Sequence, residues 1–299
     1  MKKIITRIKG GLGNQLFCYA AARRLASVND AELVIDDVSG FVRDYQYQRK
    51  YMLDNFHIPA RKATPSELLE PFPRYKRGLI KIINRWRPYQ QRCYLEQEGI
   101  AFDRRLLDFK VNGTIYLDGY WQSELYFKDI ADVIRQDLLI MPSMNMLNLE
   151  IAQRIRNSES VCVHFRCYDN PTCNNNETDI HSNLEKGYYE RAVKEIMKRV
   201  VKPHFFLFSD NLQEARNMLN LPEGDVTIVN HNASDDNDFT DFLLMTQSKH
   251  FIISNSTFSW WGAWLSSNTN KIIVAPQKIK NGEGTWGFKN LFPESWQLI

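Results

Sequence analysis

No stretch of this 299-residue sequence approaches the roughly 18 consecutive apolar residues that a membrane-spanning helix requires. The first ten residues, MKKIITRIKG, lack the apolar core of a signal peptide, so we expect a cytoplasmic protein. An excess of one charge is also missing, because 38 Lys and Arg stand against 35 Asp and Glu. This balance excludes a protein whose whole surface is built for nucleic acid, and we predict no nucleic-acid partner.

Cysteine is scarce. The five cysteines, an odd number, include no Cys-x-x-Cys pair and no histidines at zinc-finger spacing, so we expect reduced thiols and no cysteine-based metal site. Apolar residues are plentiful, since 43% of the chain is hydrophobic and 12% aromatic. That is enough to form the cores of two ordinary domains, and it excludes disordered and coiled-coil proteins.

The first half of the chain alternates strands with helices. A strand is predicted over residues 3–8, followed by a glycine-rich turn at 10–14 and a helix over 15–28. Short apolar runs predict further strands at 33–35 and 114–117. The first half is therefore predicted to be α/β.

The second half has a more regular rhythm of short apolar strands and helices. The predicted strands are 161–164, 204–208, 226–229, 250–253 and 271–274. This pattern predicts a Rossmann-like, doubly wound parallel sheet with helices on both faces. Such sheets bind ligands beyond the carboxyl ends of their strands. We place the boundary between 142 and 157, giving domains 1–150 and 151–299.

Residues 74–92 form a basic segment that contains no acid. Its cations are Arg74, Lys76, Arg77, Lys81, Arg85, Arg87 and Arg92, and its apolar residues on one helical face are Tyr75, Leu79, Ile82, Ile83 and Trp86. Two interpretations stay open. The helix packs its apolar face on its own domain, or it makes peripheral contact with an anionic membrane surface, at the inner face of the membrane.

Arg166 follows the strand 161–164, where a ligand would lie. A guanidinium stays charged and matches phosphate oxygens, so Arg166 suits a pyrophosphate leaving group; the alternative is an ion pair with Asp169. His164 either binds phosphate or ribose or is a buried core imidazole. Ser209 and Asp210 follow the next strand, where the carboxylate either binds a ribose or base edge or caps the following helix.

The segment 254–265, SNSTFSWWGAWL, takes a strand directly into a helix. Hydroxyl groups and backbone N–H groups at such a helix start form an anion site, to which Asn255, Ser256, Thr257 and Phe258 would contribute. The alternative is an ordinary N-cap, and we expect the tryptophans to pack the helix on its sheet.

The glycine-rich turn has the same strand-to-helix form. Its candidate ligands are Gly11, Gly13, Asn14 and Gln15. Residues 235–238 include an Asp-x-Asp, which we attribute to helix capping and not to metal binding.

Three segments together resemble the bacterial α-1,2-fucosyltransferases of glycosyltransferase family 11. They are GGLGNQLF at 10–17, His164-x-Arg166-x-x-Asp169, and the segment 254–265; shorter matches include GYWQS at 119–123 and FSD at 208–210. Two positions depart from the family, which usually has Arg where Cys167 stands and an acid where Asn211 stands. These departures put a secondary phosphate contact and a base or ribose contact in doubt.

The resemblance implies a GT-B-like enzyme, with two Rossmann-like domains facing a cleft. Residues 151–299 would bind GDP-fucose and residues 1–150 would lie on the acceptor side. It implies inverting transfer of L-fucose to the 2-hydroxyl of a terminal β-galactoside, in an O-antigen or lactose-like glycan that is free or lipid-linked, without metal or cofactor. By matching position, Arg166 would bind the β-phosphate, Ser256 to Phe258 the pyrophosphate, and Asn14 and His164 would complete the donor site.

No pattern identifies the general base. Asp36, at a strand end in the acceptor-side half, is the candidate and Asp118 the alternate; a dissociative reaction without a strong side-chain base is the third option. Two other functions stay open. One is transfer of fucose or another GDP-sugar to a different acceptor, and the other is a catalytically inactive nucleotide- or glycan-binding protein.

Overall fold

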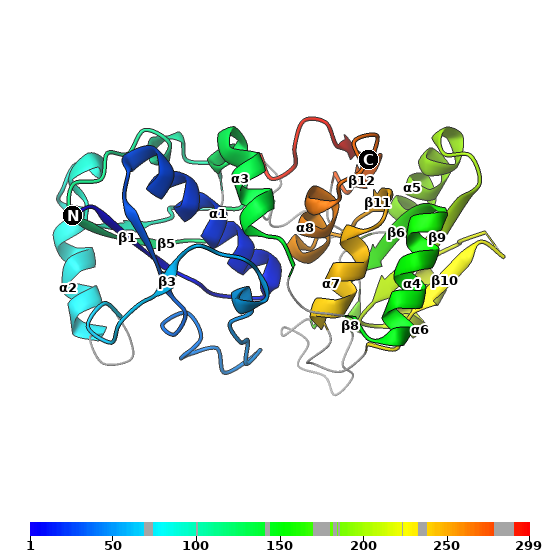
Figure 1. The fold of residues 1–299 in the computed structure, drawn as a ribbon, viewed down its shortest axis with the longest axis horizontal. Helices are drawn as coiled ribbons and strands as arrows, with labels where there is room; N and C mark the ends of the chain where they lie inside the picture. Colours follow the sequence, from blue (N-terminus) through cyan, green and yellow to red (C-terminus); the bar gives the residue numbers. More distant parts are fainter. Residues whose placement is uncertain are drawn as a thin grey trace. The chain divides into compact units, whose positions relative to one another are not determined.

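The protein consists of two compact units, shown in the computed structural model of Figure 1. The first comprises Met1–Pro142 with Lys289–Phe292, and the second Ser143–Phe288 with Pro293–Ile299. The return of a short C-terminal segment to the first unit was not predicted from the sequence. The structure describes residues 1–68, 74–99, 101–140, 144–169, 180–181, 184, 186–222, 224–232, 238–277 and 290–299.

The first unit contains a five-stranded sheet of order β3-β2-β1-β5-β4, in which every neighbouring pair is parallel. Its strands are β1 Lys3–Arg7, β2 Glu32–Asp36, β3 Arg61–Lys62, β4 Tyr94–Glu96 and β5 Thr114–Asp118. Its helices are α1 Leu12–Asn29, α2 Arg74–Arg85 and α3 Ala131–Asp137, with short 3₁₀ turns at Leu53–Asn55, Tyr89–Gln91, Arg104–Leu106, Glu124–Tyr126 and Lys128–Ile130. The central strand β1 and helix α1 are mostly buried, which agrees with the predicted strand, turn and helix.

The second unit contains a six-stranded parallel sheet of order β10-β9-β6-β11-β12-β13. The strands are β6 Glu159–Phe165, β9 Pro203–Ser209, β10 Val226–Val229, β11 His250–Ile252, β12 Ile273–Ala275 and β13 Gln297–Leu298; β7 Tyr168–Asp169 and β8 Ile180–His181 form a separate antiparallel pair. The helices are α4 Met146–Asn157, α5 Lys186–Arg199, α6 Leu212–Met218, α7 Asp238–Thr246 and α8 Thr257–Leu265. The predicted parallel α/β sheet is confirmed.

Helices cover both faces of this second sheet. Side chains alternate along a strand, and the odd-numbered residues of β6 join one core with buried residues of α5 and α6, including Val161, Val163, Tyr189 and Ala215. His164 points to the other face, where its ring lies 5.8 Å from that of Phe258 in α8. The sheet is therefore doubly wound, as expected from the sequence.

The tryptophans of α8 form part of the core of the second unit. Trp260, Trp261 and Trp264 are at most 2% exposed, and their ring centroids lie 5.1 to 6.2 Å apart. Trp296, next to the C-terminal strand, adds a further ring contact with Trp260 at 5.3 Å. The prediction that these rings pack the helix on its sheet is confirmed.

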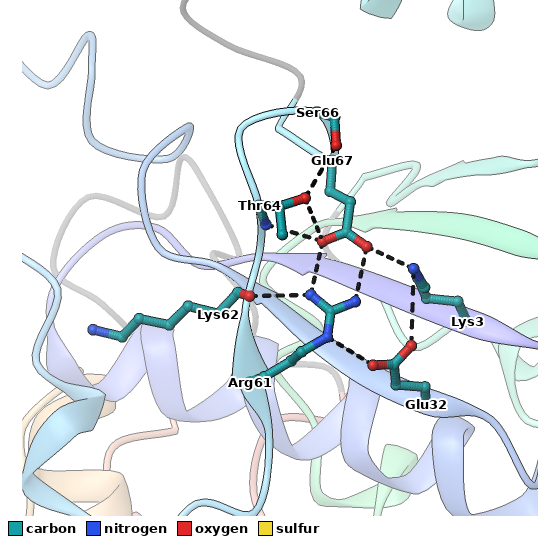
Figure 2. A network of polar contacts seen from close by, with 7 residues as sticks. All are labelled: Lys3, Glu32, Arg61, Lys62, Thr64, Ser66 and Glu67. Carbon is teal, nitrogen blue, oxygen red and sulfur yellow. Dashed lines mark hydrogen bonds and ion pairs between the residues drawn. The ribbon is translucent and has the colours of Figure 1, made fainter.

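A charged network ties together the amino ends of three strands in the first unit (Figure 2). Glu67 accepts both Nη groups of Arg61 at 2.8 Å and Lys3 Nζ at 2.6 Å, while Arg61 Nε reaches Glu32 Oε1 at 2.7 Å. These hydrogen bonds from Arg61 and Lys3 hold the pKa of Glu67 well below its usual range. Lys3, Glu32 and Arg61 begin β1, β2 and β3, so the network fixes the sheet at the edge opposite the strands' carboxyl ends.

Helix α2 corrects one expectation. Its apolar face does not pack on the domain, because Tyr75, Leu79, Ile82 and Trp86 are 75%, 56%, 62% and 85% exposed. The inward face is polar instead and is centred on Asn84, which is 4% exposed. Among the described residues, no helix combines the length and apolar character needed to cross a membrane.

Candidate active site

The carboxyl ends of three adjacent strands gather the predicted donor-site residues of the second unit. Strand β6 lies between β9 and β11, with His164 opposite Phe208 and Val163 opposite Ile252. Arg166, Asp210 and Ser254 follow directly or closely after the three strand ends. Because parallel strands end at one edge, this register places the candidate side chains there together.

Arg166 and Asp210 are ion-paired, with Arg166 Nε 3.1 Å from Asp210 Oδ2. The other carboxylate oxygen accepts the backbone N–H of Cys167 at 3.0 Å. Asp210 therefore orients the guanidinium, a role the sequence did not suggest. The helix-capping alternative for Asp210 is wrong, since Asn211 caps α6 by accepting the Glu214 N–H at 3.0 Å. Ser209 supports this turn, because its Oγ accepts the Asn211 N–H at 3.0 Å.

His164 is 5% exposed, and its Nδ1 lies 2.8 Å from Ser254 Oγ. Burial, together with the nearby Arg166 charge, lowers the pKa of His164 to about 3. The ring is therefore neutral near pH 7, with one N–H donor and one lone pair. The buried-imidazole interpretation describes its surroundings, and its place at the strand end keeps it beside Arg166.

The start of α8 has the capping geometry expected from its sequence. Ser256 is the N-cap, and its Oγ accepts the Phe258 N–H at 3.3 Å. Asn255 is 9% exposed, whereas Ser256, Thr257 and Phe258 are half-buried. The aromatic ring of Phe258 lies between His164 and Phe242, 5.8 and 5.2 Å from their centroids, so the first turn of α8 is fixed to the end of β6.

Two tyrosines of α5 brace this edge, and the sequence analysis missed both. Tyr188 donates its hydroxyl to the carbonyls of Ile253 at 2.6 Å and Val274 at 3.1 Å, and Tyr189 to the carbonyl of His164 at 3.3 Å. Burial raises the pKa of Tyr188 well above its usual value, so the phenol remains a donor. No signal in the sequence distinguishes these residues from ordinary core tyrosines.

In the first unit, the glycine-rich turn joins β1 to α1. Gly10 has a left-handed φ of 76°, and Gly11 is the N-cap of α1 without a side-chain cap. Gly13 is buried in the first turn. Gln15 is fully buried, and its amide bonds the carbonyls of Gly10 and Lys50 and the Met52 N–H, so it holds the following loop in place.

Asn14 is oriented by a residue that sequence reasoning did not assign. Gln122 Nε2 donates to Asn14 Oδ1 at 2.7 Å. The turn carrying Gln122 includes Trp121 at a φ of 53°, an unfavourable region for a bulky residue, and Gln97 Oε1 fixes it by accepting the Trp121 N–H at 2.9 Å. The match at 119–123 marked this segment, but only the structure gives it a role.

The two candidate bases differ in environment. Asp36 is 2% exposed, and its Oδ1 accepts the N–H groups of Val38 at 3.2 Å and Ser39 at 2.8 Å; burial nevertheless raises its pKa. Burial also acts on Asp118, but Lys9 at 2.7 Å and Arg7 at 3.2 Å outweigh it and hold the pKa of Asp118 well below its usual range. Asp118 is thus a weak base.

Part of the predicted site lies outside the described residues. Asp169 belongs to β7, but its side chain is not among those described, and neither are residues 170–179 and 235–237. The ion pair of Arg166 that can be described is the one with Asp210. Within the described ranges, no three His, Cys, Asp or Glu side chains are grouped as metal ligands would be.

Comparison with known proteins identifies the family. The model of Glycosyl transferase family 11 matches residues 3–298. Two *Escherichia coli* relatives are an alpha-1,2-colitosyltransferase, 28% identical with 100% of this chain and 99% of the relative aligned, and the O-antigen biosynthesis glycosyltransferase WbnK, 29% identical with 97% and 98% aligned. The structure of *Arabidopsis thaliana* FUT1 in complex with GDP is similar in fold, with a TM-score of 0.53 and 12% identity over 91% of this chain and 70% of that one. Two parallel α/β units and a family match over almost every residue place this chain in glycosyltransferase family 11, with a GT-B-like fold.

Proposed function

We propose that this protein transfers L-fucose from GDP-fucose to the 2-hydroxyl of a terminal β-galactoside in an O-antigen or lactose-like glycan. The observation that carries the proposal is the oriented guanidinium of Arg166, beside a neutral His164 and the start of α8. We assign GDP-fucose binding to the second unit and acceptor binding to the first. The similarity to enzymes of O-antigen synthesis supports a glycan acceptor, free or lipid-linked.

The chemistry of the leaving group explains the residues at the edge of the second sheet. As the bond between fucose C1 and the phosphate oxygen breaks, negative charge grows on the β-phosphate of GDP. Arg166 would stabilise that charge, held in place by Asp210, and the N–H groups and dipole of α8 would support the pyrophosphate. Fixed donors of this kind can replace the cation that other sugar transferases need, so we propose a reaction without metal or other cofactor.

His164 has a different role in this proposal. A neutral imidazole can hydrogen-bond a phosphate or ribose oxygen through one nitrogen while the other stays with Ser254. It adds no charge to the site and cannot serve as a general acid near pH 7. We therefore propose it as a ligand that positions the donor. Asn14 and Gly11 are proposed as further donor contacts, with Gly13, Gln15, Ser209 and Asp210 supporting the turns that carry them.

The transfer itself would be a single displacement. The acceptor oxygen forms a bond to fucose C1 on the face opposite GDP, the C1–O bond to phosphate breaks, and the anomeric configuration inverts. The acceptor hydroxyl loses one proton in this step. Of the two carboxylates considered, Asp36 is the better base because its pKa is raised, whereas Lys9 and Arg7 hold Asp118 ionised and weakly basic.

A second donor is favoured by one finding. An *E. coli* relative that matches this chain from end to end is named for colitose transfer, and colitose is L-fucose without its 3-hydroxyl. GDP-colitose is thus the alternative donor. The two sugars differ by one hydroxyl group, so a site that hydrogen-bonds this group would strongly prefer fucose.

The test is GDP release from GDP-fucose and from GDP-colitose, with and without lactose, in EDTA, with the product linkage determined by NMR. Lactose-dependent release from GDP-fucose giving an α-1,2 linkage is the expected result. Arg166→Ala should lower kcat by at least about 100-fold, while Arg216→Ala, at an exposed arginine of the same unit, should not change it. Equal turnover in Arg166→Ala would remove the phosphate role, and preferential use of GDP-colitose would replace the proposed donor.

A further inference from the structure

Helix α2 exposes a continuous apolar stripe. Tyr75, Leu79, Ile82, Ile83 and Trp86 are spaced three or four residues apart and are 49% to 85% exposed. At 3.6 residues per turn, this spacing places them on one face. An amphipathic helix of a globular domain normally buries this face, whereas here it points away from the protein.

The opposite face of the helix is anchored to the edge strand β4. Asn84 is buried, donates to the Tyr94 carbonyl at 3.0 Å and accepts the Cys93 N–H at 3.2 Å. Lys81 is ion-paired with Glu96 and lies 5.4 Å from the ring centroid of Tyr94. Turning the stripe inward would break these contacts and bury Leu79 against polar groups. The outward orientation is therefore built into the fold.

Positive charge borders the stripe on both sides. Arg85 lies on one side of the helical face and Arg87 on the other, and both side chains are exposed. Within the described part of the chain, neither arginine forms an ion pair, in contrast to Arg92, which binds Glu98 at 3.0 Å. Two guanidinium groups thus remain on the outer surface beside Trp86, a residue suited to the boundary between water and lipid.

We propose that α2 docks this protein on an anionic lipid bilayer. The helix would lie in the plane of the surface, with Leu79, Ile82 and Trp86 inserted at the boundary between headgroups and acyl chains. Arg85 and Arg87 would bind lipid phosphates. The proposal rests on the exposure and charge of this helix and does not depend on which sugar the enzyme transfers.

The charge distribution favours a bilayer over a second copy of the chain. A two-fold contact through the stripe would bring the same basic helix from both protomers together, with Arg85 and Arg87 of each facing like charges. Residues 74–92 contain no acid that could compensate. An anionic surface satisfies the cations and the apolar residues simultaneously, as the inner leaflet of a bacterial membrane would.

The test is cosedimentation of the intact protein with vesicles of phosphatidylcholine alone or with about 30% phosphatidylglycerol. We expect binding to the anionic vesicles that weakens with salt. Arg85→Gln with Arg87→Gln should lower the partition coefficient about 30-fold, and Leu79→Ser, Ile82→Ser and Trp86→Ser together more than about 100-fold. The matched control Lys110→Gln with Lys128→Gln removes the same charge from exposed positions elsewhere in the first unit and should change binding less than about 3-fold.

Turnover with a soluble acceptor should be unchanged in both sets of variants, which shows that they fold. Two results would overturn the proposal. One is equal binding of the wild type and the α2 variants to anionic vesicles. The other is a lipid-free dimer in sedimentation velocity that the triple serine variant converts to monomer, because the stripe would then be an interface between two copies.

Discussion

Acid should destabilise this protein through His164. In the folded chain the imidazole is 5% exposed, and burial together with Arg166 lowers its pKa from 6.5 to about 3. Once the chain unfolds, the ring returns to water and regains its ordinary pKa. Between these two values the unfolded chain binds one proton that the folded chain does not, so the free energy of unfolding falls as the pH falls.

The size of the effect follows from the two pKa values. Within the window the free energy of unfolding changes by about 1.4 kcal/mol per pH unit. Lowering the pH from about 7.5 to about 5 therefore removes about 2 kcal/mol through His164 alone, with a ceiling of about 5 kcal/mol near pH 3. His164→Asn removes the titrating ring but keeps an amide near Nδ1 that can bond Ser254 Oγ, the partner at 2.8 Å.

Urea unfolding followed by tryptophan fluorescence measures this difference. Trp260, Trp261, Trp264 and Trp296 are all buried in the second unit, so the emission reports on the unit that contains His164. Between about pH 7.5 and about pH 5, the wild type should lose about 2 kcal/mol more than His164→Asn. His57→Asn, at an exposed histidine of the first unit, should follow the wild type. Parallel pH dependences for the wild type and His164→Asn would refute the buried neutral imidazole.

Three other predictions concern packing, charge and the donor site. Gly40→Ala should destabilise the first unit by at least about 3 kcal/mol in urea, because a Cβ there would lie 1.8 Å from the Ile8 carbonyl oxygen, whereas Gly78→Ala in α2 meets nothing within 4 Å and should not. Glu67→Gln should lower the urea midpoint in dilute buffer and much less in about 1 M NaCl, where exposed charges are screened; an equal loss in both would contradict the ionic account. Asp210→Asn should raise the KM for the sugar nucleotide about 10-fold by releasing Arg166, and an unchanged KM would show that the pair does not orient the donor site.

The sequence predicted the sheets because their signals are local. Short apolar strands alternating with helices are typical of parallel sheets buried on both faces, and both sheets are confirmed as parallel. The partnership of β1 with β5, more than a hundred residues apart, left no mark in either strand. The return of residues 289–292 to the first unit is equally hidden, because it depends on contacts far apart in the chain.

Residue types predicted the place of the site better than the partners within it. A strand end followed by an arginine was enough to select Arg166, yet the expected partner was Asp169 and the one observed is Asp210, 44 residues later on the neighbouring strand. Gln122 and Tyr188 act through single hydrogen bonds to distant groups, and any buried glutamine or tyrosine looks the same in sequence. Pairings of this kind follow from strand order, which a single sequence does not encode locally.

The features that depart from ordinary folding rules are also the ones to which function is assigned. Trp121 has a left-handed φ, His164 is a neutral imidazole buried beside a cation, and α2 turns its apolar face outward. Each costs folding free energy that a more ordinary residue would save. The first orients Gln122 and Asn14, the second stands at the end of β6, and the third leaves a basic apolar surface exposed. Since neighbouring contacts hold all three in place, folding strain is retained where a ligand or a membrane can repay it.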